Sequence, residues 1–354
     1  MTSGLIQSSP FTGRIHRTDQ VMLQVILALI PGTLAMIWYF GWGVLINMAL
    51  ASLFALASEA LVMRLRGRPP LPALGDLSAL VTALLFAIAV PPTLPWWLTL
   101  LGIAFAIIIV KQLYGGLGYN PFNPAMAGYV FLLISYPLQM TTWLAPDIPE
   151  ILSAHHLSTL SFADSARLIF TGALPPNLTW DAVSAATPLD QMFTQLDQNA
   201  TIPEILANPL WGDFGGRGWE WIGNWFLLGG LYLLWRRIIT WHIPVAVLAG
   251  LLLPAAMLWL LDPQSHPFPA FHLFAGGTIL GAFFIATDPV TASTTPRGQL
   301  IYGAAIGLII LSIRHWGGYP DAVAFAVLLM NIAAPIIDHY TQPRVFGHSR
   351  RKET

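Results

Sequence analysis

The sequence predicts an all-α polytopic membrane protein with about ten transmembrane helices, arranged as two five-helix inverted repeats with one large extracytoplasmic loop. The first observation is composition: 55% of the 354 residues are hydrophobic and only 9% are charged, whereas ordinary globular domains carry about 25% charged residues. The second is a series of apolar runs long enough to cross a bilayer. The third is the uneven distribution of lysine and arginine between those runs.

Ten apolar runs are candidates for transmembrane helices, and a polar N-terminal segment, residues 1–20, precedes them. A helix that crosses a bilayer needs about 20 mostly apolar residues. The first run begins near Val21 and is long enough to stay in the membrane rather than be cleaved as a signal peptide. The expected spans are residues 21–40, 42–63, 77–93, 95–113, 123–139, 219–237, 242–261, 270–287, 299–316 and 320–338.

Lysine and arginine set the expected orientation. With ten spans and a cytoplasmic N-terminus, 13 of the 16 basic residues fall on the cytoplasmic side, as the positive-inside rule requires. Only Arg167, Arg217 and Arg314 fall outside. We therefore expect both termini in the cytoplasm and the long segment 140–218 on the outer face of the membrane.

The segment 140–218 divides the chain into two halves of nearly equal size. Residues 21–139 and 219–338 each hold five expected spans, and an odd number of spans gives the halves opposite orientations, as in an inverted repeat. Residues 339–354 form a cytoplasmic C-terminal tail. The net charge of −1 provides no basic surface for nucleic acid. The sequence has no cysteine, which excludes Cys-ligated iron–sulfur clusters within this chain, so any redox chemistry requires a bound cofactor.

The outer segment contains the most informative motif, Asp181-Ala-Val-Ser184-Ala-Ala-Thr187-Pro-Leu189. The Thr187 hydroxyl lies between small alanines and a proline, with the Ser184 hydroxyl three residues earlier, so a bulky group has room to approach. The proline biases Thr187 toward an extended backbone. From these residues alone, a turn or a helix N-cap is the more ordinary interpretation. Trp180 is a candidate for stacking on a bound ring, although packing within the loop would also explain it.

Two polar stretches interrupt the expected spans. Asn120-Pro-Phe-Asn123-Pro follows three glycines and opens the fifth span, where a helix N-terminus with Asn side chains could hold an anion or the polar edge of a heterocycle. A tight re-entrant turn is the alternative. Asp288 and Thr291 follow the eighth span, and a carboxylate near membrane depth is costly unless it is paired or functional. An ordinary helix end beside Arg297 is the alternative there.

Other polar residues in the spans have simpler interpretations. Glu59 is expected to extend toward the membrane interface near Arg64. Lys111 and Asp338 lie at span ends and are expected to be boundary residues. Asn331 is expected to bond between helices rather than to bind a ligand.

The three motifs resemble those of the NqrB/RnfD family, whose flavin-attachment motif reads approximately Asp-x-x-Ser/Thr-Gly/Ala-Ala/Ser-Thr-x-Leu. Ala185 stands where the family often has Gly or Ser. The resemblance implies FMN joined to Thr187 by a phosphodiester, with Ser184 and Asp181 as motif partners. It also implies a second, non-covalent flavin such as riboflavin, with Asn120, Asn123, Asp288 and Thr291 as candidate contacts.

The resemblance covers essentially the whole chain and is closer to RnfD members than to NqrB members, because the N-terminal segment is short. It implies a subunit of an Rnf-type complex of the bacterial inner membrane, which couples electron transfer between ferredoxin and NAD to sodium or proton movement. The implied partners are Rnf subunits A, B, C, E and G, membrane lipid, and a flavin transferase that uses FAD and releases AMP. A secondary transporter or channel with an inverted repeat and no flavin would also explain the spans and broken helices, as would a scaffold subunit without a cofactor.

Overall fold

The computed structural model describes residues 17–342 apart from residues 209, 318 and 320. The segments 1–20 and 339–354 fall largely outside the described residues, together with five basic residues used for the expected orientation: Arg14, Arg344, Arg350, Arg351 and Lys352. The described chain is mostly helical, and the sheet found in it has two short strands. The predicted helical class is therefore confirmed.

Five helices are long and apolar enough to cross a membrane. They are α1 (Thr18–Phe40), α2 (Trp42–Leu65), α13 (His242–Leu261), α16 (Pro296–Trp316) and α17 (Val323–Thr341). Shorter apolar helices accompany them: α4 (Ser78–Ala89), α5 (Trp96–Ala104) with its π-helical continuation η1 (Phe105–Gln112), and α6 (Pro124–Ser135). Together with α12 (Trp219–Trp235) they give the chain the make-up of a multi-pass membrane protein.

Every expected span overlaps a helix, and the main differences lie in three short or broken ones. The third span ends at Ala89, because prolines 91, 92 and 95 cannot continue a helix. The fifth ends at Ser135 and is followed by the short helix α7 (Pro137–Thr141). The eighth consists of α14 (Phe271–Phe274), α15 (Thr278–Leu280) and the π-helix η3 (Gly281–Ile285), since Gly276 adopts a positive φ of 76° that interrupts it. A short helix α3 (Pro70–Leu74) lies between α2 and α4.

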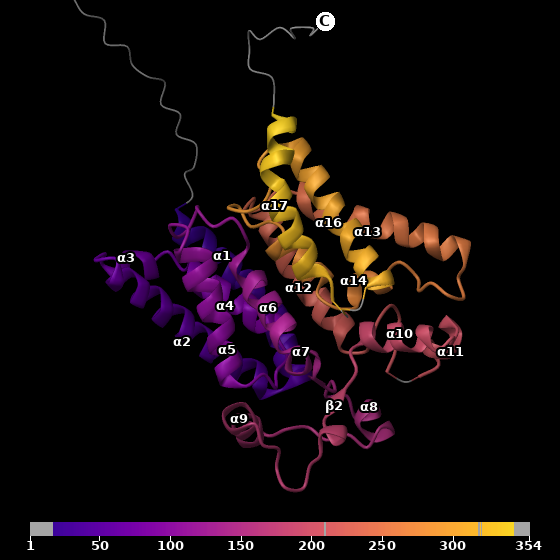
Figure 1. The fold of residues 1–354 in the computed structure, drawn as a ribbon. Helices are drawn as coiled ribbons and strands as arrows, with labels where there is room; N and C mark the ends of the chain where they lie inside the picture. The colour runs from indigo at the N-terminus through magenta and orange to yellow at the C-terminus, as the bar shows by residue number, and fades with distance from the viewer. Residues whose placement is uncertain (1–16, 209, 318, 320, 343–354) are drawn as a thin grey trace, which may run out of the picture.

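Elements of the two halves have matching neighbours. Helix α2 packs against α4 and α5, as α13 packs against η3 and α16, and α1 contacts α4 as α12 contacts α15. Helix α6 contacts α5 as α17 contacts α16. Two contacts join the halves, α1 with α12 and α6 with α17, and Figure 1 shows the indigo-to-magenta half beside the orange-to-yellow half. The non-helical segment 90–95 between α4 and α5 therefore corresponds to the segment 286–295 between η3 and α16.

Glycines allow the closest helix contacts. A Cβ at Gly307 of α16 would lie 2.2 Å from the Val247 carbonyl oxygen of α13, and a Cβ at Gly250 would lie 2.2 Å from the Ala304 carbonyl oxygen. Gly303 precedes Gly307 by four residues, so α16 carries the small-residue spacing that lets membrane helices approach at backbone distance. Side chains larger than hydrogen would force α13 and α16 apart.

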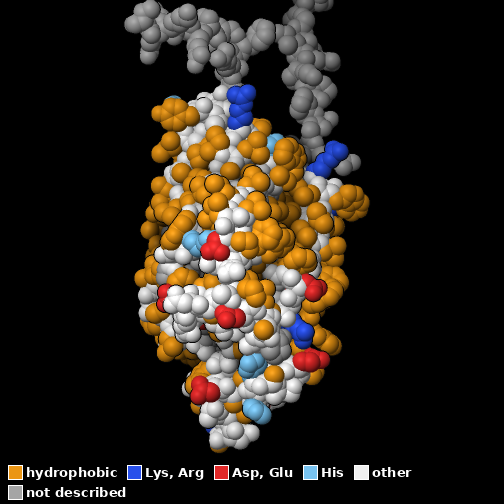
Figure 2. All heavy atoms as spheres, turned by 90° about the vertical axis from the view of Figure 1, so that its right-hand side faces the viewer, with side chains coloured by type: hydrophobic (Ala, Val, Ile, Leu, Met, Phe, Trp, Pro, Cys, Tyr) orange, Lys and Arg blue, Asp and Glu red, His pale blue; other side chains and the backbone are white. Residues whose placement is uncertain are grey.

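The segment between the halves folds into small elements beyond the ends of the long helices. Strand β1 (Trp143–Leu144) pairs antiparallel with β2 (Ser184–Ala185), with Trp143 opposite Ala185. The other elements are α8 (Pro149–Ala154), α9 (Phe162–Thr171), η2 (Trp180–Ala182), α10 (Pro188–Asp197) and α11 (Ile202–Leu206). The face drawn in Figure 2 is mostly apolar, and its acidic side chains gather toward this segment, away from the two chain ends.

Candidate cofactor sites

Two cavities lie along the same central elements. The Thr187 cavity, which Thr187 lines, has a volume of about 110 Å³, and the Asn123 cavity, which Asn123 lines, has a volume of about 310 Å³. Elements α4, α6 and η3 contribute side chains to both cavities. The volume of the Asn123 cavity lies at the lower end of the range for sites that hold small ligands, whereas the volume of the Thr187 cavity falls below that range.

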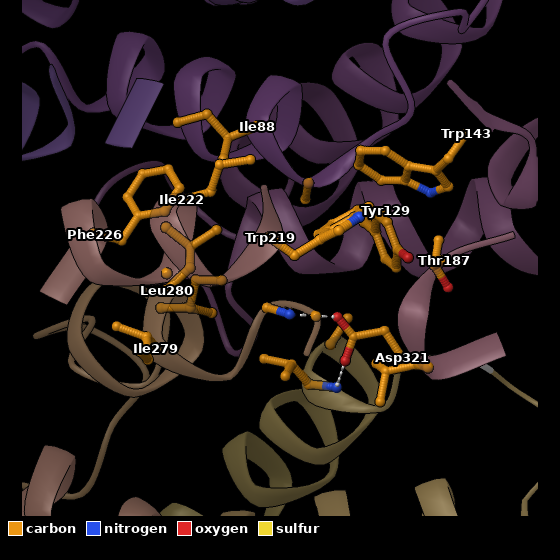
Figure 3. A pocket seen from close by; sticks show the side chains of 18 of the residues that line it. Ile88, Tyr129, Trp143, Thr187, Trp219, Ile222, Phe226, Ile279, Leu280 and Asp321 are labelled. Carbon is orange, nitrogen blue, oxygen red and sulfur yellow. Dashed lines mark hydrogen bonds between the residues drawn. The ribbon is translucent and has the colours of Figure 1, made fainter. Parts of the chain in front are cut away.

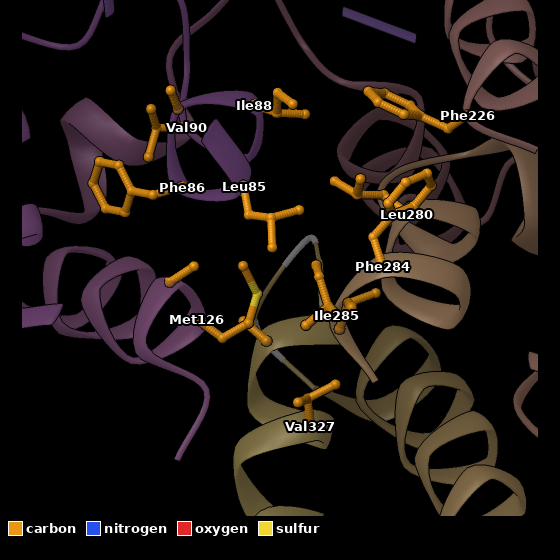
Figure 4. Close-up of a cluster of buried hydrophobic side chains, with 14 of the residues drawn as sticks. Leu85, Phe86, Ile88, Val90, Met126, Phe226, Leu280, Phe284, Ile285 and Val327 are labelled. Carbon is orange, nitrogen blue, oxygen red and sulfur yellow. The ribbon is translucent and has the colours of Figure 1, made fainter. Parts of the chain in front are cut away.

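An apolar layer lies between the linings of the two cavities, and Figure 4 labels its side chains. Ile88 and Ile285 line the Thr187 cavity, whereas Leu85 and Phe284 line the Asn123 cavity. All four side chains are buried in one hydrophobic cluster, and α4 and η3 each supply one residue to each side. The layer therefore offers water and ions no hydrogen-bonding partner between the cavities.

Thr187 lines its cavity from the N-terminus of α10. Its backbone is extended, with φ −67° and ψ 157°, as the following proline predicts. Its Oγ1 accepts a hydrogen bond of 3.2 Å from the Asp190 amide, so Thr187 is also the N-cap of the helix. The helix N-terminus carries a partial positive charge that favours an anion. An N-cap and an attachment point for a phosphate are therefore compatible at this residue.

Leu189 of the motif also lines the Thr187 cavity, whereas Ser184 and Asp181 line neither cavity. The Ser184 hydroxyl donates a hydrogen bond of 2.8 Å to the Trp180 carbonyl, which closes the turn before β2. Asp181 is exposed. Trp180 is 43% exposed and does not contribute to the cavity wall, so it is not placed to stack on a ring bound there.

Two other tryptophans line the Thr187 cavity. Trp143 and Trp219 pack edge to face with their ring centroids 5.0 Å apart, and Phe40 contacts both at 5.6 and 5.0 Å. In Figure 3, Trp143, Tyr129 and Trp219 lie toward the Thr187 end of the cavity, whereas Ile88 and Phe226 lie toward the other. Neither tryptophan was predicted from the sequence, because a tryptophan near a span end fits an ordinary aromatic belt equally well.

A buried ion pair forms part of the same wall. The Asp321 carboxylate accepts hydrogen bonds from the Gly277 amide at 3.0 Å, the Val323 amide at 3.2 Å and Arg314 Nη2 at 3.2 Å. The Arg314 side chain is 2% exposed and the Asp321 side chain 28%. The carboxylate therefore faces the cavity. Arg314 is one of the three basic residues expected outside the cytoplasmic side, and the Asp321 carboxylate balances its charge.

Three of the four residues predicted for a second site line the Asn123 cavity: Asn120, Asn123 and Asp288. Thr291 does not line it, but its Oγ1 donates a hydrogen bond of 3.0 Å to Asp288 Oδ2 and so holds that carboxylate. Asp288 lies three residues beyond the end of η3 and forms no ion pair with Arg297 within the described part of the chain, so it follows a helix end and also lines the cavity.

Asn120 contributes an unsatisfied polar atom to this cavity. Its Nδ2 donates a hydrogen bond of 3.0 Å to the Phe122 carbonyl, whereas its Oδ1 is buried without a partner among the described residues. A buried acceptor without a partner costs about 1–3 kcal/mol. A ligand with an N–H or O–H donor at this position would remove that cost.

Asn331 joins the elements around the cavity. Its Oδ1 accepts a hydrogen bond of 3.0 Å from the Asn123 amide, and its Nδ2 donates to the Tyr302 hydroxyl at 2.8 Å and to the Thr291 carbonyl at 3.3 Å. The prediction that Asn331 bonds between helices is confirmed. Asn331 thereby links α6, α16 and the segment after η3.

The expectations that Glu59 extends toward the membrane interface and that Lys111 is a boundary residue were wrong. Lys111 Nζ donates to Glu59 Oε1 at 2.6 Å and to Ser78 Oγ at 2.6 Å, and the two charged side chains are 2% and 1% exposed. Position near a span end does not reveal which face a residue occupies. The π-helix η1 places Lys111 toward α2 and α4, so it is buried despite its position near the end of the span.

Comparisons with known proteins place this architecture in a family. Residues 5–347 match the model of the NQR2, RnfD, RnfE family. The chain is 54% identical over 351 residues to the D subunit of the ion-translocating oxidoreductase complex of Yersinia pestis, covering 97% of this chain and 98% of that protein. It is 52% identical over 354 residues to the protein of the same name from Aeromonas hydrophila subsp. hydrophila, covering 98% and 99% of the two chains. The corresponding Shigella dysenteriae serotype 1 protein is 50% identical over 353 residues, again covering 98% and 99%.

Proposed function

Because the chain belongs to the NQR2, RnfD, RnfE family, we propose that it is the D-type membrane subunit of an ion-translocating oxidoreductase complex and carries FMN covalently on Thr187. The observation that carries this proposal is the position of the Thr187 hydroxyl. It lines a cavity with two tryptophans in its wall and lies at the N-terminus of a ten-residue helix. The names of the relatives support the assignment to such a complex.

The attachment follows from the local chemistry of α10. A phosphodiester between FMN and Thr187 Oγ1 carries one negative charge, and the first amides of α10 would stabilise it. Ser184 keeps the turn closed through its bond to the Trp180 carbonyl, and the β1–β2 pair fixes the segment just before Thr187. Asp181 is exposed, where the attaching enzyme could recognise it as part of the motif.

The cavity residues would offer a flat aromatic ring mostly apolar contacts. Trp143 and Trp219 offer apolar surface and exclude water from one side. Asp321 has lone pairs beyond its three bonds and could accept from a ring N–H. When bound, a flavin supplies one- and two-electron transfer, which no side chain of this protein provides. The protein holds, orients and shields the ring.

We further propose that the Asn123 cavity binds a second flavin, such as riboflavin, without a covalent bond. The unpartnered Asn120 Oδ1 supports a ligand that donates a hydrogen bond there. Asn123 and Asp288 would contact the same ligand, and Thr291 would keep the Asp288 carboxylate in place. Thr187 lines the other cavity, across the apolar layer formed by α4 and η3, so two rings would form successive stations for electrons.

The matched neighbours of the two halves support ten spans in an inverted repeat, residues 21–139 and 219–338. In this arrangement the chain crosses the bacterial inner membrane with both termini in the cytoplasm and the Thr187 segment, residues 140–218, in the periplasm. The Asn123 cavity then opens toward the cytoplasm. The apolar layer would insulate the two sides while electrons cross it.

The complex proposed for this protein transfers electrons between ferredoxin and NAD and couples that transfer to ion movement. Rnf subunits A, B, C, E and G would be its partners, and a flavin transferase would attach FMN from FAD and release AMP. The coupled ion would pass through the polar breaks that hold Asn120, Asn123 and Asp288. These residues supply carbonyl, amide and carboxylate oxygens, which suit either sodium or a proton relay.

Covalent flavin is tested by substitution at Thr187 in cells that contain the flavin transferase. Thr187→Ala and Thr187→Asn should both abolish the fluorescence of the denatured protein band and the FMN mass on the peptide that holds residue 187. Asn is a good N-cap, so that variant separates loss of the attachment point from loss of the helix cap. Thr141→Ala is the matched control, since Thr141 lines the same cavity outside the motif.

A fluorescent band in either Thr187 variant would show that the attachment point is elsewhere. A wild-type protein of unmodified mass would instead support the transporter interpretation. Fluorescence lost in Thr141→Ala as well would indicate that the cavity, rather than the hydroxyl, governs attachment.

A further inference from the structure

A buried ion pair borders the Asn123 cavity and has no part in the function proposed so far. Lys111 lines the cavity, whereas Glu59 lies behind it and does not. Their charged atoms are 2.6 Å apart and both side chains are almost fully buried. The pair is therefore oriented with its cation toward the cavity and its anion toward α2.

The π-helix η1 places the cation. This wide helical turn runs for eight residues and ends at Gln112, directly after Lys111. Such turns are rare and occur frequently at functional sites. Lys111 Nζ uses two of its three N–H donors on Glu59 Oε1 and Ser78 Oγ, and Gln112 Nε2 donates to the same Glu59 oxygen at 2.8 Å. The third ammonium donor has no partner among the described residues and is available to a ligand.

A gain in the stability of the fold does not explain why the Glu59–Lys111 ion pair is buried. A buried ion pair is often no more stabilising than apolar residues of similar volume, and charged groups at membrane depth are retained mainly where they serve a function. Glu59 Oε2 is also buried without a partner among the described residues, so the pair is incompletely satisfied. A ligand that gains negative charge would be attracted to the cavity side of such a pair.

We propose that Lys111 stabilises the negative charge that a flavin ring in the Asn123 cavity acquires on reduction. The carboxylate of Glu59, on the side of Lys111 away from the cavity, partly offsets the positive charge of Lys111. The inference rests on the proposed occupancy of that cavity by a non-covalent flavin. Lys111 is an electrostatic and positioning residue here. Asp288 also lines the cavity and acts with the opposite sign, but it is unchanged in the variants below.

The experiment measures the midpoint potential of the loose flavin in the purified complex by spectroelectrochemical titration. Lys111→Met should lower that potential, because the reduced ring loses a nearby positive charge. Glu59→Gln should raise it, because the same charge is no longer offset. We expect each change to alter the affinity for reduced relative to oxidised flavin by roughly tenfold, the scale of one unit charge at short range in a partly buried site.

Shifts of opposite sign in the midpoint potentials of the two single variants distinguish this electrostatic role from a structural one. Loss of packing would shift the potential in the same direction in both variants. The double variant Lys111→Met/Glu59→Gln removes both charges, avoids an unpaired buried charge, and should give an intermediate potential. Arg66→Met is the matched control: Arg66 also contacts Gln112 but is exposed and does not line the cavity, so solvent screens its charge. It should leave the potential unchanged.

Unshifted potentials, or shifts of the same sign in both single variants, would refute the role of Lys111 while leaving the flavin site intact. A wild-type complex without loose flavin would refute the proposed occupant and this inference together. Fluorescence of the covalent flavin on Thr187, measured on the same samples, reports separately on the other cavity.

Discussion

Asn331 offers the sharpest test of how the two halves are held together. In the variant Asn331→Leu, the side chain keeps the same number of heavy atoms but loses every hydrogen bond. The Asn123 amide and the Tyr302 hydroxyl then lose their bonds to residue 331, and the Thr291 carbonyl loses one. Tyr302 is completely buried and Asn123 is 3% exposed, so water does not replace these bonds.

The expected cost follows from these contacts. A buried polar group left without a partner costs about 1–3 kcal/mol, whereas interhelical hydrogen bonds in membrane proteins average about 0.6 kcal/mol. Two buried groups that each lose a partner, with little freedom to rearrange, give roughly 2–4 kcal/mol. The second asparagine that links a helix to a non-helical segment, Asn47, provides a control. Its amide donates only to the Pro91 and Pro92 carbonyls, and its Oδ1 already lacks a partner, so Asn47→Leu should cost about 1 kcal/mol.

Both variants are compared with the wild type by equilibrium unfolding in detergent, followed by tryptophan fluorescence. Asn331→Leu should also weaken binding of the loose flavin, because the Asn123 amide is released, and should leave covalent flavin on Thr187 unchanged. Equal losses of stability in the two variants, or a smaller loss for Asn331→Leu, would contradict the assignment of Asn331 as the junction between the halves.

Three further predictions concern other parts of the chain. Gly307→Ala should lower the free energy of unfolding by about 1–3 kcal/mol, because its Cβ would lie 2.2 Å from the Val247 carbonyl oxygen. The control is Gly223→Ala, whose Cβ would have its nearest contact at 3.3 Å. This control should be neutral or stabilising in the same assay. Thr187→Ala should destabilise α10 by about 0.5–2 kcal/mol through loss of the N-cap, measured as faster amide hydrogen exchange in residues 189–197. Thr187→Asn should restore slow exchange without restoring the proposed flavin. Burial raises the pKa of Asp190 above its usual value of 3.8, so its ionisation opposes folding as pH rises through that raised pKa. Asp190→Asn should therefore be more stable than the wild type at pH 7 and equal to it near pH 3.5, and a difference that does not depend on pH would contradict this.

The helices could be predicted from the sequence to the extent that hydrophobicity determines them. Apolar runs identified α1, α2, α13 and α16 within a few residues, since a membrane helix needs a nearly continuous apolar stretch. Hydrophobicity did not reveal that α4 ends at Ala89 or that the eighth span is interrupted, because these features depend on local proline and glycine geometry. The pairing of Glu59 with Lys111 could not be predicted, because it joins residues 52 positions apart through the orientation of a π-helix.

The candidate sites likewise contain some residues that the sequence could identify and others that only the fold reveals. Thr187, Asn120, Asn123 and Asp288 could be selected because each lies in a short motif, and the structure brings the last three into one cavity. Trp143, Trp219 and Asp321 carry no local signal. They reach the Thr187 cavity from a strand, from the first turn of α12 and from the segment before α17, so only the assembled fold reveals them.

The contact between Phe40, Trp143 and Trp219 bears on the order of events during biogenesis. Phe40 ends the first long helix, Trp143 belongs to the strand that pairs beside Thr187, and Trp219 begins the first helix of the second half. Thr187, the proposed acceptor, therefore takes up its native surroundings only after the ribosome has delivered residue 219 and both helices have been inserted. If Thr187 carries FMN as proposed, attachment after that point would take place at the rim of a finished cavity, and attachment before it would take place on a segment that has not yet folded.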